Sequence, residues 1–167
     1  YSSAASDVYK RQEYEIIYVE KGEGDCLVGD SIISYSKGDL ILFGSELPHS
    51  MQSPPDDGEE SDNEEKSELK VRGVNIQFEK DFMHYSISQY SQFIPIRNLL
   101  EDACRGIKFT ITRSGKIIKL LEQIPSAKGA DQIILLLSLL QMMAISNHRK
   151  YLTTSHYTPS PSIMRNE

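Results

Sequence analysis

The sequence contains no tryptophan, only two cysteines and four histidines among its 167 residues, and no long uninterrupted hydrophobic run. The longest apolar stretch, 133–145, is broken by Ser138 and Gln141 and is too short to span a bilayer as a helix. Cys26 and Cys104 lie far apart and lack metal-binding or redox spacing, which predicts two buried, reduced thiols in a cytoplasmic protein. The composition therefore argues against a membrane protein and against a disulfide-rich secreted domain.

Histidine is too sparse to build an obvious metal centre. His49, His84, His148 and His156 are the only ones, and no two of them stand at the spacing of metal ligands. We therefore predict no metal ligands, no cofactor and no catalytic residues.

Negative charge is concentrated in one segment, 52–69. Eight acidic residues and a single lysine lie between positions 56 and 68, while the whole chain has a formal net charge of −6. The rest of the chain is close to neutral, so no face is predicted to bind phosphate groups. The segment is typical of a mobile, solvated loop. A functional acidic tract that mimics nucleic acid or binds a cation is the alternative.

Two apolar runs with glycines at their ends dominate the first half of the chain. The first, YEIIYVEKGEG at 14–24, is rich in aromatic and β-branched residues; the second, GDLILFGSELPH, occupies 38–49. Short antiparallel strands joined by tight turns need glycine at such places. This pattern predicts strands at 14–20, 25–28, 31–35, 40–43 and 71–79, with a hairpin turn at Gly29-Asp30.

Together the two runs resemble the motif pair of the cupin-type sensor domain of AraC-family transcription regulators, and the resemblance extends over most of 13–150. It implies an α+β fold, with an N-terminal cupin-like antiparallel β-barrel followed by C-terminal helices. It also implies a domain that senses a small polar effector, such as a sugar, and dimerises. Two alternatives stay open: a free-standing metal-dependent cupin enzyme acting on a small sugar or acid, and a non-sensing dimerisation module whose barrel is filled by side chains.

From Ser88 onward the apolar residues recur at the helical period, which predicts helices over 93–104, 110–124 and 130–147. The third is apolar around nearly its whole circumference, so it must be buried on more than one side. We expect a homodimer in which Leu136, Leu140 and Met143 form the interface. The alternative is that the first two helices cover this face within one chain.

Strand alternation selects the candidate ligand-binding residues. Along 71–79, one face carries Val74, Ile76 and Phe78 and should pack on the helices, while Asn75 and Gln77 face either solvent or a dry barrel lumen. By the resemblance, the face of 14–20 that carries Glu15 points inward. The predicted ligand-binding set is Glu15, Ile17, Val19, Ser31, His49, Met51, Asn75 and Gln77.

Each polar candidate also has a simpler interpretation. Glu15 can be a rim carboxylate paired with Arg11 or Lys21, Gln77 can bind water at the rim, and His49 can be a hydrogen-bonded residue that closes the barrel mouth.

The two ends of the chain complete the predicted organisation. Residues 1–12 show no periodicity and are expected to be a non-native leader. Residues 13–87 are assigned to the barrel and 88–150 to the helical dimerisation segment. Residues 151–167 are expected to be a linker toward a DNA-binding domain that this chain does not contain, so any contact with DNA would be made through that domain.

Overall fold

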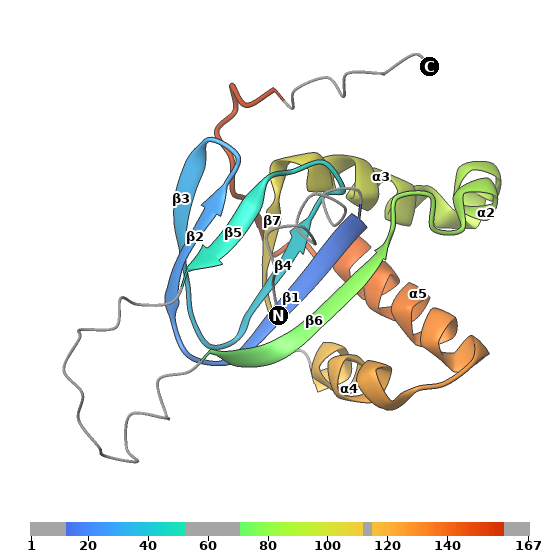
Figure 1. Cartoon of the computed structure of the whole chain (residues 1–167). Coiled ribbons are helices and arrows are strands. Elements are labelled where there is room, and N and C mark those ends of the chain that lie inside the picture. Colours follow the sequence, from blue (N-terminus) through green and yellow to red (C-terminus); the bar gives the residue numbers. More distant parts are fainter. Residues whose placement is uncertain (1–12, 53–70, 112–114, 159–167) are drawn as a thin grey trace, which may run out of the picture.

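The computed structural model describes residues 13–52, 71–111 and 115–158 (Figure 1). The expected leader, nearly all of the acidic segment and the end of the expected linker lie outside these residues. Within them the chain forms an α+β fold of antiparallel strands and helices, as the sequence predicted.

The strands form two sheets. The first has the order β6-β1-β4-β7-β8, with β6 Arg72–Glu79, β1 Glu13–Lys21, β4 Asp39–Phe43, β7 Ile107–Thr110 and β8 Arg149–Tyr151. The second has the order β3-β2-β5, with β3 Ser31–Tyr35, β2 Gly24–Val28 and β5 His49–Gln52. No ladder joins the two sheets among the described residues, so they show two facing sheets and not the continuous closed barrel that we expected.

Helices cover the face of the five-stranded sheet that points away from the three-stranded sheet (Figure 1). They are α2 His84–Gln89, α3 Ile94–Asp102, α4 Gly115–Gln123 and α5 Ala130–Ala144, with short 3-10 turns at Ser91–Phe93, Ala103–Arg105 and Ile124–Ser126.

The five-stranded sheet therefore has a hydrophobic core on each face. The helix-side core joins Ile16, Leu40, Leu42 and Phe78 of the sheet to the buried faces of the helices. The inter-sheet core lies between the two sheets and consists of Val19, Cys26, Val28, Tyr35, Ile41, Phe43, Leu47 and Leu152. Alternation along β1 sends Ile16 to the first core and Val19 to the second, which explains why this strand is apolar on both faces.

The first five predicted strands agree with the structure to within about one residue, whereas three further strands were missed. β5, β7 and β8 are only four, four and three residues long, too short to show an alternating pattern. β7 and the first two residues of β8 lie within 88–150, the segment that we assigned to the helices. The second helix consequently begins at Gly115, and not at 110, because residues up to Thr110 pair with β4.

The third helix ends at Ala144, three residues earlier than predicted, for a local reason. The guanidinium of Arg149 donates hydrogen bonds to the carbonyls of Met143 and Ala144 at 3.3 and 2.8 Å, satisfying acceptors that the helix leaves free. The chain then turns into β8. None of the helices in the described parts of the chain is long and apolar enough to cross a membrane.

Candidate functional site

Three of the predicted ligand-binding residues meet at one end of the space between the sheets. The Glu15 carboxylate lies 2.7 Å from His49 Nε2 through Oε2, and its Oε1 accepts a hydrogen bond of 2.9 Å from Asn75 Nδ2. The side chains of Glu15 and His49 are 16% and 17% exposed, so water or a small molecule reaches them. We call these three residues the polar cluster.

The strands place these groups by their register. Glu15 on β1 stands opposite Phe43 of β4 on one side and Gln77 of β6 on the other. His49 is the first residue of β5, and its ring stacks on Phe43 with a centroid distance of 3.9 Å and an interplanar angle of 4°. His49 comes from the three-stranded sheet and Glu15 from the five-stranded sheet. Their contact therefore links the two sheets through side chains, where no ladder does.

The imidazole of His49 is bonded at both of its nitrogens. Nδ1 lies 2.8 Å from the Leu47 carbonyl, which can only accept, so Nδ1 donates this hydrogen bond. Nε2 faces a carboxylate oxygen of Glu15. The polar cluster therefore combines a carboxylate, an imidazole and an amide and is rich in hydrogen-bonding groups.

Beyond the polar cluster, the space between the sheets is filled by apolar side chains. Val19, Cys26, Val28, Ile41 and Phe43 are all completely buried. Burial also raises the pKa of the Cys26 thiol to about 11, so this residue stays uncharged and unreactive at neutral pH. The described interior between the sheets is thus packed with side chains, and the polar cluster lies at its accessible end.

The other predicted ligand-binding residues occupy different environments. Ile17 and Met51 are half-buried and pack against the inter-sheet core, to which Val19 belongs. Ser31 lies two strands away from His49, because Val28 of β2 separates them in the ladder, and its hydroxyl donates to Asp30.

Two environments were left open for Asn75 and Gln77, solvent or a dry barrel lumen, and the structure shows the first. Both are exposed, since β6 is an edge strand of its sheet. The opposite face of β6 packs on the helices as predicted, with Phe78 buried and Ile76 half-buried.

No group of three or more histidine, cysteine or acidic side chains among the described residues is arranged to hold a metal ion. Glu15 and His49 supply two ligands at most, and both already hydrogen-bond to protein groups.

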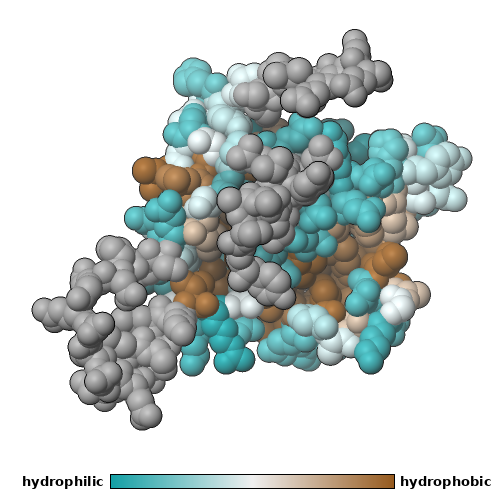
Figure 2. Space-filling view, in the orientation of Figure 1, coloured by the Kyte–Doolittle hydropathy of each residue, from teal (hydrophilic) through white to brown (hydrophobic). Residues whose placement is uncertain are grey.

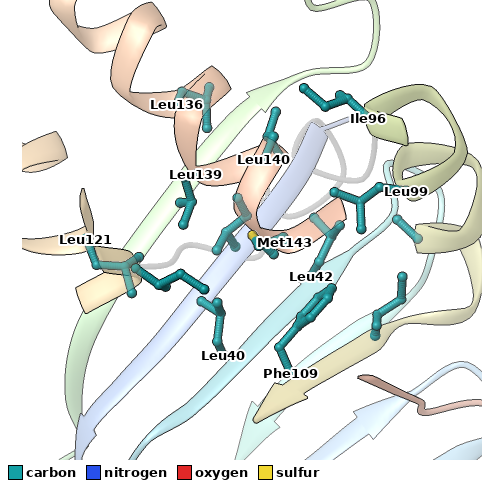
Figure 3. Close-up of a cluster of buried hydrophobic side chains, with 14 of the residues drawn as sticks. Leu40, Leu42, Ile96, Leu99, Phe109, Leu121, Leu136, Leu139, Leu140 and Met143 are labelled. Carbon is teal, nitrogen blue, oxygen red and sulfur yellow. The ribbon is translucent and has the colours of Figure 1, made fainter. Parts of the chain in front are cut away.

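The predicted dimer interface is wrong in its choice of residues. Leu140 and Met143 are completely buried and Leu136 is 7% exposed, all within the helix-side core of a single chain. Figure 3 shows these side chains on α5 together with other members of the same core, among them Leu42 and Leu99. The physical reason is that the sheet and the other helices cover this stripe, which is the alternative left open by the sequence.

The outward side of α5 instead forms the floor of a groove that the sequence did not reveal. The groove has a volume of about 600 Å³, with Leu137 and Met142 on its floor, Phe93 and Ile96 on one wall and Leu120 on the other. Figure 2 shows hydrophobic surface over this part of the molecule. Ile134 and Ile145, on the same side of α5, are 56% and 58% exposed.

The two cysteines differ in a way that the sequence did not predict. Cys26 is buried, but Cys104 is exposed and free, so the expectation of two buried thiols holds for only one of them.

Two facing antiparallel sheets with the polar cluster at one end of the space between them, backed by a layer of helices, make up the described part of the chain. Residues 8–62 match the family model of the AraC-like ligand binding domain. This match confirms the resemblance over these residues. The matched segment contains Glu15 and His49. A search of curated proteins found no match. A domain of this family points to effector binding in a regulator and to a regulatory, non-enzymatic role.

Proposed function

We propose that this chain is the effector-sensing domain of an AraC-type DNA-binding regulator and that it binds a small neutral polar molecule, such as a sugar, at the polar cluster. DNA contact would be made by a separate DNA-binding domain of the regulator. The observation that carries the proposal is the hydrogen-bonded Glu15–His49 pair, which lies within the family-matched segment and is joined by Asn75.

The chemistry of the cluster favours a neutral ligand. A sugar hydroxyl both donates and accepts, so it can bind Glu15, the amide of Asn75 and the neighbouring Gln77 without bringing a charge. An anion would instead meet the Glu15 carboxylate oxygens, which accept hydrogen bonds and repel negative charge. Desolvating an unpaired charge there would be costly.

A screen by thermal unfolding tests this function. Neutral monosaccharides, the corresponding sugar acids and the corresponding amino sugars are each added in excess, because a ligand that binds only the folded state raises Tm. We expect a neutral sugar to raise Tm. Glu15→Gln should abolish the shift, whereas Glu20→Gln on the same strand, whose carboxylate pairs with Arg72 at 3.4 Å, should preserve it. A shift that survives Glu15→Gln would place the ligand elsewhere.

We further propose a homodimer in which a second copy of the chain seats its α5 on the groove beside α4. The apolar floor at Leu137 and Met142, together with the exposed Ile134 and Ile145, provides a self-complementary surface along one helix. A two-fold axis across α5 would bring the same residues of both copies together and cover them. This interface replaces the buried stripe that the sequence suggested.

One observation favours a second candidate function. The filled inter-sheet core is what a non-sensing dimerisation module would show, because such a module needs no cavity. The two functions differ in the screen above. A module without an effector dimerises but gives no Tm shift that depends on Glu15.

A further inference from the structure

Residues 152–157, which we call the strap, follow β8 and lie against the turn between β2 and β3. The strap is fixed at its start by backbone hydrogen bonds, from Leu152 N to the Gly106 carbonyl at 3.0 Å and from Thr153 N to the Arg105 carbonyl at 3.1 Å. These residues were expected to be a linker, but Leu152 belongs to the inter-sheet core. The strap leads from this core toward residue 158 and the rest of the chain.

The far end of the strap is held by the turn between β2 and β3. The Asp30 carboxylate accepts hydrogen bonds from the Thr154 backbone N–H at 3.2 Å and from the Thr154 hydroxyl. The Tyr157 ring lies against Gly29, where a Cβ would come within 2.9 Å of it. Gly29 also has a φ of 54°, a conformation that glycine adopts readily. The hydrogen bond from Thr154 lowers the pKa of Asp30, so this acceptor is ionised at neutral pH.

The same turn is bonded to the chain beside His49. Gly29 N–H donates to the Pro48 carbonyl at 2.9 Å, and Val28 pairs with His49 in the ladder between β2 and β5. A displacement of His49 therefore moves the peptide that holds Gly29, on which Tyr157 rests.

A second connection runs through the inter-sheet core. His49 stacks on Phe43 and bonds to the Leu47 carbonyl. Leu47 and Leu152 approach each other over Gly106, where a Cβ would lie 3.2 and 3.3 Å from their side chains. The first residue of the strap thus packs beside the residue that orients His49. Closely packed groups of this kind cannot shift independently.

The docking of the strap is incomplete in one respect. The Thr153 hydroxyl is buried, yet it finds no hydrogen-bond partner within the described parts of the chain. Burying an unpaired hydroxyl opposes docking, because water would satisfy this group in the released strap. Docking is therefore favoured by some contacts and opposed by another, as expected for a segment that responds to a small change nearby.

We propose that the strap is the output element of the polar cluster, so that a change at Glu15 and His49 alters how firmly residues 152–157 dock on the β2–β3 turn. This inference rests on the proposed effector function, since it assigns the route by which occupancy of that site reaches the following chain. Coupling between two sites is reciprocal, so loosening the strap must also loosen the polar cluster.

Amide hydrogen exchange on the full chain tests the coupling without any effector. Glu15→Gln removes the carboxylate that pairs with His49 and keeps the side-chain shape. We expect it to speed exchange of the Thr154 and Tyr157 amides several-fold, while Glu20→Gln leaves them unchanged. In the reverse direction, Asp30→Asn should speed exchange in β5. The matched control is Asp25→Asn, which removes an exposed carboxylate from β2 that only weakly bonds Ser34 at 3.4 Å.

The α5 amides provide the internal reference, since they belong to the helix-side core. If the exchange rates of the α5 amides rise by the same factor, the substitution has lowered the stability of the whole domain. This result would overturn the inference. Changes confined to the neighbourhood of each substitution would also overturn it. Because no ligand is added, failure of the sugar screen with coupling preserved would reject the proposed effector and retain the strap as an element linked to the cluster.

Discussion

The two faces of the five-stranded sheet are covered in different ways. The helix-side core is large and consists of aliphatic and aromatic side chains drawn from α2 to α5 and the sheet. The inter-sheet core is smaller, and it ends in a glutamate, a histidine and an asparagine that remain accessible. The comparison fits a division of roles in which the helical side stabilises the domain and the side between the sheets carries the proposed effector site.

Leu140 provides the strongest test of this division. Truncating this completely buried side chain to alanine should lower the free energy of unfolding by about 2–5 kcal/mol, because it leaves a cavity in the helix-side core. Urea denaturation measures the loss, and Ile134→Ala on the exposed side of the same helix is the control, expected within about 0.5 kcal/mol of wild type. If Leu140→Ala lowers the free energy of unfolding by less than about 1 kcal/mol, the assignment of Leu140 to the core is contradicted.

Phe43 lies in the inter-sheet core and touches the polar cluster, so its substitution should affect both roles. Phe43→Leu should cost about 1–2 kcal/mol of unfolding free energy and should also weaken effector binding, because His49 loses the ring on which it stacks. Chemical denaturation and a ligand titration on the same variant separate the effects. Unchanged binding would show that the stacked ring does not position His49.

Ile134 tests the outer surface of the helical side. Ile134→Glu should change the stability of one chain by no more than about 0.5 kcal/mol, since the side chain is exposed, but it should separate the dimer by placing a carboxylate in an apolar contact. Light scattering combined with size-exclusion chromatography measures the molar mass of the variant and so distinguishes monomer from dimer. The control is Ile32→Glu on β3, which is 71% exposed and far from the groove. If Ile134→Glu remains dimeric, the interface lies elsewhere.

The smallest expected effect concerns the two thiols. Their initial reaction with a labelling reagent is expected to leave the free energy of unfolding unchanged. Cys104 should react with a thiol reagent at mildly alkaline pH, while Cys26 should react only after unfolding, because burial raises its pKa to about 11 and covers the sulfur. Spectroscopic counting of reactive thiols should give one rapid equivalent, and Cys104→Ser should remove it. Two rapid equivalents would show that the inter-sheet core opens readily.

The strands of the first half could be predicted because glycine turns and alternating apolar residues mark them. The apolar and polar faces of β6 followed from the same alternation, whereas the inward orientation of the Glu15 face of β1 came from the family resemblance. The meeting of Glu15 with His49 could not be derived, because they are 34 residues apart and belong to different sheets. The resemblance to a known family, not periodicity, brought them into one set.

The prediction that Leu136, Leu140 and Met143 form a dimer interface was wrong because the periodicity of apolar residues carries limited information. A helix that is apolar all round has no signal to tell which side meets the sheet, and Leu140 and Ile134 look equivalent in sequence. β7 and β8 were missed because their pairing with distant strands, and not their own composition, makes them strands.

The most direct test of the division of roles is a ¹H–¹⁵N NMR titration of the full chain with the monosaccharide that most raises its Tm. The account predicts that the largest shifts fall on the amides of Glu15, His49 and Asn75, with α4 and α5 scarcely affected. Shifts concentrated at Phe93, Leu120 and Met142, or the absence of any saturable shift, would contradict the assignment of effector binding to the side between the sheets.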